Sequence, residues 1–164
     1  MKQVIIIRGP LGVGKSTISK MLAKKIAATY YSIDSCLSEH KLDVIPEGEP
    51  CIPLKSFIQV NDILLPSIKR DLENNSGVII DGNFYHKDQL IDLCDKLKEY
   101  DSLVITLKAP VEKCIQRDSK RKPPHGKWAA IAVHSLVSKF DAGTVIENLD
   151  IERTMNKIIS LIRE

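Results

Sequence analysis

A glycine-rich segment near the start of the chain, GPLGVGKST at Gly9–Thr17, limits the possible folds more than any other feature. It follows the apolar run Val4–Ile7 and precedes ISKMLAKKIAA, which has a helical pattern. The spacing G-x-x-x-x-G-K-[ST] between a strand and a helix is typical of a loop whose backbone amides surround an anion. Glycine permits the positive φ angles of such a loop, and the next helix points its positive dipole end at the same anion. The sequence therefore predicts a loop that binds a polyphosphate.

A nucleoside triphosphate is the expected ligand of this loop, with ATP and Mg²⁺ as cofactors. Lys15 should reach the β- and γ-phosphates, and the Ser16 hydroxyl should hold Mg²⁺. The residues expected to bind ATP here are Gly9, Pro10, Leu11, Gly12, Val13, Gly14, Lys15, Ser16 and Thr17.

Composition narrows the class of protein. A chain of 164 residues suits one domain, and its net charge of +3 gives no strong field for nucleic acid. No apolar run approaches the roughly 20 residues of a membrane span. Since the chain begins close to a strand pattern, we expect no signal peptide and a cytoplasmic protein. The four cysteines lie far apart and are expected to be free thiols.

Continuous apolar runs alternate with helical patterns along the chain. Such runs suit parallel strands buried on both faces, and the alternation predicts an α/β sheet. Ligands in these sheets bind outside the carboxyl ends of the strands. The expected strands are Val4–Ile7, Val78–Ile80, Leu103–Leu107 and Val145–Ile146, with Tyr30–Ile33 more equivocal. The expected helices are Ser16–Ala28, Leu54–Asn74 (kinked or split at Pro66), Lys87–Glu99, Val111–Lys120, Trp128–Phe140 and Ile151–Arg163.

Two segments do not fit regular elements. Lys41–Pro53 is rich in proline, and the basic segment Lys120–Lys127, KRKPPHGK, is broken by prolines and a glycine. Irregular segments in a compact domain are often lids or substrate loops, although a plain solvated connection is the alternative. Trp128 is expected to anchor the following helix by packing. The four histidines are dispersed and show no metal-ligand spacing.

Asp81 ends the run GVIIDGN and resembles a carboxylate that holds Mg²⁺, directly or through water. The alternative is an Asp-Gly hairpin turn, but the following FYHKDQL supplies no clear partner strand. If Asp81 binds the metal, Asn83 and Tyr85 should face the same crevice as substrate contacts.

Asp34 ends the shorter run YYSIDSCL. A carboxylate here could accept the proton of an attacking hydroxyl, which makes Asp34 a candidate catalytic and substrate-binding residue. A helix N-cap is the alternative role, and both roles could hold together.

Arg117 and Arg121 stand four residues apart in VEKCIQRDSKR. On a helix they would share a face and repel each other unless an anion lay nearby. A transferring γ-phosphoryl group is such an anion, so Arg121 is a candidate catalytic residue. The alternative is a solvated basic helix end.

These segments, taken in order, resemble the small P-loop kinases over nearly the whole chain. SIDS at Ser32–Ser35 resembles the substrate-acid segment of chloramphenicol phosphotransferases and shikimate kinases. VIIDGNF resembles the strand end of gluconate kinase-like and polynucleotide kinase-like proteins. The resemblance implies a five-stranded parallel sheet in the order 2-3-1-4-5, a lid at about residues 118–128 and a substrate-binding region at about 34–75. It also implies that Arg117 flanks adenine, that Arg121 acts from the lid and that Glu147 and Asn148 border the adenine.

The chain also departs from these families. It reads DGNFY where adenylate kinases have DGFPR, and no arginine follows Asp34 closely, where shikimate kinases use one to bind a carboxylate. The resulting hypothesis is an ATP–Mg²⁺-dependent kinase that acts on a hydroxyl of a small molecule. Two alternatives stay open: a polynucleotide 5′-hydroxyl kinase, and a nucleotide-binding regulatory module with weak NTPase activity. The acceptor, the preference for ATP over GTP and the oligomeric state are not predicted.

Overall fold

Five parallel strands form the centre of the molecule in a computed structural model that describes residues 3–163. Their spatial order is β2-β3-β1-β4-β5, as expected from the sequence. The strands are β1 (Gln3–Arg8), β2 (Thr29–Ser32), β3 (Val78–Gly82), β4 (Asp101–Lys108) and β5 (Thr144–Glu147). The helices are α1 (Lys15–Ile26), α2 (Ile33–Glu39), α3 (Leu54–Glu73), α4 (Lys87–Lys96), α5 (Val111–Ser119), α6 (Lys127–Val137) and α7 (Ile151–Arg163).

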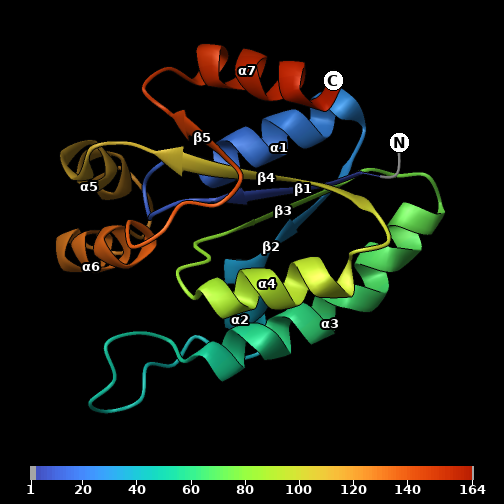
Figure 1. The fold of residues 1–164 in the computed structure, drawn as a ribbon. Helices are drawn as coiled ribbons and strands as arrows, with labels where there is room; N and C mark the ends of the chain where they lie inside the picture. The colour runs from blue at the N-terminus through green and yellow to red at the C-terminus, as the bar shows by residue number, and fades with distance from the viewer. Residues whose placement is uncertain (1–2, 164) are drawn as a thin grey trace.

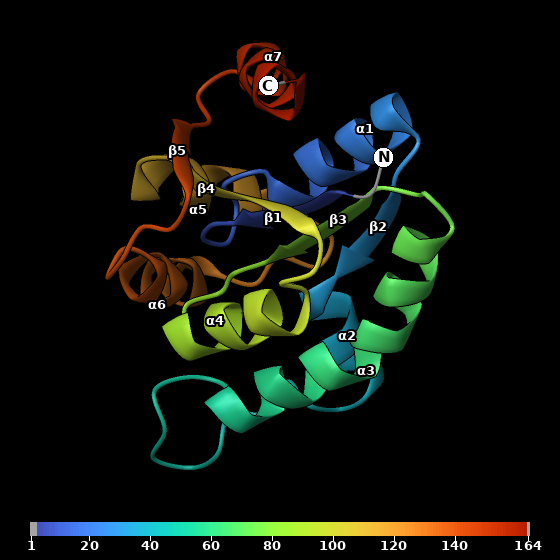
Figure 2. The same ribbon diagram turned by 45° about the vertical axis from the view of Figure 1, so that its right-hand side comes forward.

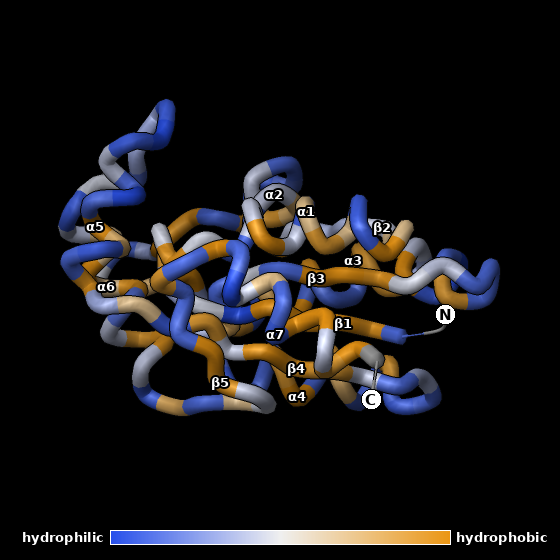
Figure 3. Tube along the Cα trace, turned by 90° about the horizontal axis from the view of Figure 1, so that it is seen from above, coloured by the Kyte–Doolittle hydropathy of each residue, from blue (hydrophilic) through white to orange (hydrophobic). Residues whose placement is uncertain are grey.

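Helices cover both faces of the sheet (Figures 1 and 2). Alternate residues of β1 serve opposite faces: Val4 and Ile6 pack with α2, α3 and α4, whereas Ile5 and Ile7 pack with α1 and α7. Burial on both faces explains the continuous apolar strands, which appear as orange runs along β1, β3 and β4 in Figure 3. None of the helices within residues 3–163 is long and apolar enough to span a membrane.

Helices α5 and α6 lie beyond the carboxyl ends of the strands (Figure 1). They pack against each other, and the basic segment connects them. The chain between α2 and α3 forms a loop without helix or strand, as expected for Lys41–Pro53. Both irregular segments therefore flank the edge of the sheet where ligands bind in this architecture.

Several local expectations were wrong. Of the kink or split expected at Pro66, the split does not occur, since α3 is one helix of 20 residues. Because Pro66 is exposed, the carbonyl that loses its helical donor can bond to water instead. Trp128 is not a packing anchor: 79% of it is exposed, and the Lys127 ammonium lies over its ring, 5.7 Å from the ring centroid. Residues 33–39 form the short helix α2, which the apolar run Tyr30–Ile33 did not indicate.

Candidate functional site

The glycine-rich loop joins β1 to α1, with Gly14 at the N-cap of α1 (φ 102°). A β-carbon at Gly14 would come within 2.6 Å of the Asn148 side-chain nitrogen, and one at Gly12 would collide with the Cys114 carbonyl on α5. Both glycines also have positive φ, which other residues rarely adopt. The loop is therefore fixed between α5 and Asn148, with its amides at the start of α1.

Lys15 is buried beneath this loop, with 6% of its surface exposed. Its Nζ donates to the Pro10 carbonyl at 2.9 Å and to Asn83 Oδ1 at 3.1 Å. Burial lowers the pKa of Lys15, and the nearby carboxylates of Asp34 and Asp81 partly oppose that shift. Asp34 and Asp81, which were predicted from separate strand ends, therefore both lie close enough to Lys15 to interact with its charge.

Asp81 lies at the end of β3 and is almost fully buried. Its Oδ2 accepts a 2.9 Å hydrogen bond from the Tyr30 hydroxyl. Burial raises the pKa of Asp81, while Lys15 and hydrogen bonds from Tyr30 and Ser16 oppose the rise. The hairpin alternative fails within the described residues, because β3 pairs there only in parallel, with β1 and β2.

A magnesium ion would fit beside Asp81. Residues 3–163 hold no group of three or more acidic, histidine or cysteine side chains that could bind a metal alone. However, Mg²⁺ prefers one or two carboxylates completed by water and substrate phosphates. The Asp81 carboxylate, hydrogen-bonded to the Ser16 hydroxyl at the start of α1, is a donor set of that kind.

Asp34 lies in the first turn of α2 and is not its cap. The cap is Ser32, whose Oγ accepts a 3.2 Å hydrogen bond from the Ser35 amide. This leaves the half-buried Asp34 carboxylate in the wall of a cavity of about 360 Å³, which Asn83 and Tyr85 also line. We call it the adjoining cavity.

A second cavity, of about 370 Å³, opens over the glycine-rich loop, and we call it the loop cavity. Its lining comprises Gly12, Gly14, Lys15, Ser16, Thr17, Arg117, Arg121, Asn148 and Ile151. The hydrogen bond between Lys15 and Asn83 connects the two cavities, since Lys15 lines the loop cavity and Asn83 the adjoining cavity.

Arg117, on α5, and Arg121, in the basic segment, have different hydrogen-bond partners. The Arg117 guanidinium donates to the Val13 carbonyl at 3.2 Å and to the Asn148 carbonyl at 2.9 Å, which offsets its charge without an anion. Arg121 is exposed at the wall of the loop cavity, and its guanidinium has no hydrogen bond or ion pair within residues 3–163. Arg121 is therefore the free cation of the pair.

A buried aspartate fastens the basic segment. Asp118, 1% exposed, accepts hydrogen bonds from the His125 ring nitrogen at 2.8 Å and from the backbone amides of His125 and Gly126 at 3.3 and 2.9 Å. Burial raises the pKa of Asp118, but these hydrogen bonds outweigh it and hold the pKa below its ordinary value. The anchor thus depends on an ionised carboxylate.

We expect acid to weaken this anchor. A carboxyl whose pKa is lower in the folded state stabilises the fold above its unfolded pKa, and that stabilisation is lost as pH falls through the folded pKa. Asp118→Asn should therefore cost about 1.5 kcal/mol of unfolding free energy at neutral pH and clearly less at about pH 3. Urea unfolding at both pH values measures this. A cost that does not shrink in acid would contradict the assignment, and Asp88→Asn, an exposed acid of α4, serves as the control.

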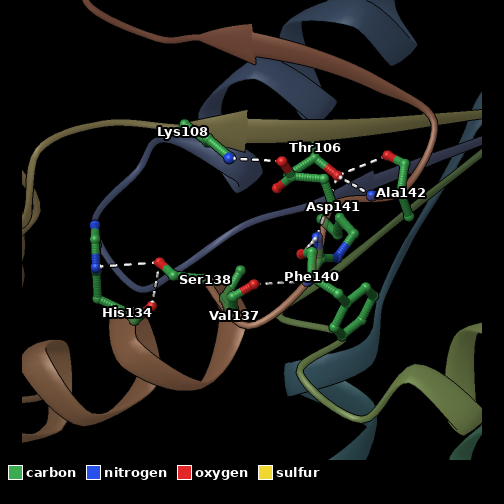
Figure 4. Close-up of polar contacts among 9 residues, drawn as sticks. Thr106, Lys108, His134, Val137, Ser138, Phe140, Asp141 and Ala142 are labelled. Carbon is green, nitrogen blue, oxygen red and sulfur yellow. Dashed lines mark hydrogen bonds and ion pairs between the residues drawn. The ribbon is translucent and has the colours of Figure 1, made fainter.

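Sequence reasoning missed Arg8, the residue directly before the loop. It is fully buried, and its guanidinium donates to the carbonyls of Phe140 (2.9 Å), Val137 (3.1 Å) and Phe84 (3.3 Å) and to the Thr106 hydroxyl (3.2 Å). Figure 4 shows three of these acceptors, Thr106, Val137 and Phe140, together with the neighbouring hydrogen bonds between Thr106 and Ala142. An arginine that ends a buried apolar strand was the available signal. Arg8 ties the end of α6 to the sheet.

The remaining histidines and cysteines have ordinary surroundings. A ring nitrogen of His40, His86 and His134 lies within hydrogen-bonding distance of a backbone carbonyl in each case. The four cysteines are free thiols, as expected.

The loop, the strand order and the strand-end acids together define the fold of a P-loop kinase. Solved structures with this fold include adenosine phosphosulfate (APS) kinase CysC from Mycobacterium tuberculosis, with a TM-score of 0.77 at 12% identity, covering 99% of this chain and 98% of that one. Shikimate kinase from Acinetobacter baumannii has a TM-score of 0.67 at 20% identity, covering 98% and 92%. A chain of the Pnkp1/Rnl/Hen1 RNA repair complex has a TM-score of 0.65 at 21% identity, covering 86% of this chain and 47% of that one.

The chain itself belongs to the KTI12 family, described as "Chromatin associated protein KTI12", whose sequence model matches residues 2–150. No match was found among curated proteins. The expected likeness to small P-loop kinases is thus confirmed, whereas membership of this particular family was not foreseen from the sequence.

Proposed function

We propose that the protein is an ATP-dependent phosphotransferase that moves the γ-phosphoryl group to a hydroxyl of a small molecule. The observation that carries the proposal is the pair of connected cavities, one lined by the glycine-rich loop and the other by Asp34. A simple nucleotide-binding module needs only the first cavity. A second cavity beside the γ-phosphate position, with a carboxylate in its wall, suits a bound acceptor.

Each proposed role follows from the position of the side chain. The loop amides and Lys15 would hold the β- and γ-phosphates, and Arg121 would neutralise charge on the transferring group. Asp34 would accept the proton of the acceptor hydroxyl, whose oxygen forms the new bond to the γ-phosphorus as the bond to the ADP oxygen breaks. Asn83 would orient the acceptor. Asp81 is held by Tyr30 away from the adjoining cavity, which favours Asp34 as the base.

Ser16 and, through water, Asp81 would hold Mg²⁺ here. When bound, this ion supplies charge neutralisation between the β- and γ-phosphates. Arg117, which stays bonded to the loop and to Asn148, would flank the nucleotide base. The basic segment, anchored at Asp118, would act as a lid that excludes water.

The test of the acceptor side is Asp34→Asn. We expect kcat to fall at least 100-fold, because the proton of the hydroxyl loses its acceptor, while the KM for ATP stays within about twofold. Steady-state kinetics with any acceptor that is turned over measures both. Glu39→Gln, an exposed acid on the same helix, is the control and should change neither constant. An unchanged kcat in Asp34→Asn would refute Asp34 as the base.

A polynucleotide 5′-hydroxyl kinase is the second candidate. It is favoured by the exposed cations of the basic segment, Lys120, Arg121, Lys122 and Lys127, and by the neighbour found in an RNA repair complex. Acceptor binding that weakens steeply with salt would support it.

The third candidate is a nucleotide-binding module. It is favoured by the description of the family, which names association with chromatin and no transferase activity. ATP consumption that is equal with and without a panel of acceptors would support the module and contradict the transferase.

A further inference from the structure

The two connected cavities have opposite charge. Three cationic side chains, Lys15, Arg117 and Arg121, line the loop cavity, and no acidic residue does. In the adjoining cavity the pattern is reversed: Asp34 and Asp43 line it, and neither lysine nor arginine is part of its described wall. The phosphate side and the acceptor side of the site therefore favour ligands of opposite sign.

The other polar groups that line the adjoining cavity do not change the negative charge of its wall. Burial raises the pKa of the Cys51 thiol and of the Tyr85 hydroxyl, so both are neutral at physiological pH. The His125 Nδ1 already contacts Asp118. Lys15 reaches the edge of this cavity, with its Nζ 3.1 Å from Asn83 Oδ1, but it lines the loop cavity, and Lys139, which acts on the Cys51 thiol, is not in the wall either. An anionic acceptor would therefore face two carboxylates with no lysine or arginine in the wall to bind it.

Most of the wall is apolar. Helix α6 contributes Ala129, Ala132, Val133 and Leu136, which lie on one face at helical spacing and belong to neither core cluster. Opposite them stand apolar side chains such as Leu37 and Ile52. These four side chains are not packed into the core. An apolar ligand that covered them would therefore gain the free energy of removing apolar surface from water. The volume of about 360 Å³ is at the lower end of the range for small-molecule sites.

Asn83 supplies a buried donor in the same wall. It is 6% exposed, and its Oδ1 accepts from Lys15, which leaves its Nδ2 as the other end of the amide. Within residues 3–163 the Nδ2 atom donates to no protein acceptor, and it is therefore available to a ligand in the cavity. The Nδ2 atom is not one of the buried polar atoms that lack a partner, so a ligand oxygen would accept from it in place of water. An acceptor hydroxyl beside Asp34 would do so.

From this wall we infer that the phosphoryl acceptor is an alcohol with an apolar body and a protonated amine. The hydroxyl lies between Asn83 and Asp34, the apolar body packs on α6, and the ammonium group pairs with Asp43. Asp43 is held for this role by the Ser38 hydroxyl, which donates to its Oδ2 at 2.9 Å. This inference rests on the proposed function and excludes nucleic acids and hydroxy acids as preferred acceptors.

Three matched alcohols test the charge, because they share the frame HO–CH₂–CH–phenyl and differ in one substituent. Phenylglycinol carries an ammonium group, phenylethanol a hydrogen and tropate a carboxylate. Ethanolamine, which lacks the phenyl ring, tests the apolar body. ATP-dependent phosphorylation gives kcat/KM for each, and calorimetry in the presence of a non-hydrolysable ATP analogue gives the binding affinity separately.

We expect phenylglycinol to exceed phenylethanol about threefold, the scale of a partly exposed ion pair. Tropate should be at least about tenfold worse than phenylethanol, and ethanolamine at least about tenfold worse than phenylglycinol. Asp43→Asn should abolish the preference for the amine. Glu47→Gln, which removes a charge from the same loop outside the cavity wall, should preserve it.

The outcomes separate the two proposals. Three outcomes would overturn the acceptor class: preferred transfer to tropate, equal use of all three phenyl compounds, or no binding of any of them. The proposed kinase activity would still stand if phosphoryl transfer to any compound is seen. Binding in the expected order without transfer would overturn the kinase and leave the ligand class standing. Loss of the amine preference in Glu47→Gln as well as in Asp43→Asn would contradict the pairing with Asp43.

Discussion

Lys15→Met should lower kcat/KM for ATP-dependent phosphotransfer by about 1,000-fold while the protein stays folded. Lys15 is the cation directly beneath the loop, and its Nζ stands at the junction of the two cavities. Methionine has nearly the same length and no charge, so the substitution removes the electrostatic contribution to the transition state with little change in packing. Steady-state kinetics and urea unfolding measure the two effects.

The fold should tolerate this change because the buried ammonium stabilises it little. Burial lowers the pKa of Lys15, so the charged form is disfavoured in the folded state; this cost is largest below the lowered pKa and is lost only as pH rises past the ordinary pKa of lysine. Methionine removes the same cost, against the loss of two hydrogen bonds. We therefore expect the unfolding free energy to stay within about 1 kcal/mol of the original.

Lys24→Met is the matched control, since Lys24 is an exposed lysine further along α1. It should leave both kinetics and stability unchanged. MgATP should also stabilise the unmodified protein by about 2.7 kcal/mol at 100 times its dissociation constant, and Lys15→Met should lose most of that gain. Turnover that survives in Lys15→Met would remove the basis for every other assignment at the site.

The sequence predicted the sheet because its strands are buried on both faces. Runs such as Val4–Ile7 and Leu103–Leu107 carry no alternation, which predicted a parallel α/β sheet, whereas the strand order that the structure shows was implied by the resemblance to small P-loop kinases. The chemistry at the strand ends followed from the same rule, since Asp34, Asp81 and Asn83 lie beyond adjacent carboxyl ends.

Other features depend on tertiary contacts that a linear pattern does not contain. Ile33 ends an apolar run and was assigned to a strand, but Ser32 caps a helix at that point. Trp128 was expected to anchor the following helix by packing, yet it lies in the first turn of α6 and is exposed to solvent. The lining of the adjoining cavity combines α2, α6 and two loops, so no single segment of the sequence could indicate its charge.

Arg8→Met should destabilise the protein by about 3 kcal/mol, which is the largest effect on stability that we expect from any single residue of the site. The guanidinium satisfies three backbone carbonyls and one hydroxyl in the interior, and it lies 4.1 Å from the centroid of the Phe140 ring. Methionine fills most of the volume but donates to none of these oxygens, so the three carbonyls lose the guanidinium as their donor, while the Thr106 hydroxyl keeps its bonds with Ala142. Urea unfolding measures the loss.

Arg8 stabilises the fold through the hydrogen bonds that its guanidinium donates and not through its charge. Burial lowers its pKa to about 10, and Asp141 only partly opposes the shift. Arg8→Lys keeps a cation but replaces the planar fork with a single ammonium, so it should recover less than half of the lost stability. Arg70→Met, an exposed arginine of α3, should cost less than about 0.5 kcal/mol.

Arg8 also links stability to the acceptor side of the site. Two of its acceptors, Val137 and Phe140, stand at and just beyond the end of α6, while the face of the same helix lines the adjoining cavity. When the bonds are lost, α6 should be less firmly held, and the KM for the acceptor should rise more than the KM for ATP. Equal changes in the two constants, or a stability within about 0.5 kcal/mol of the original, would show that Arg8 does not position this helix.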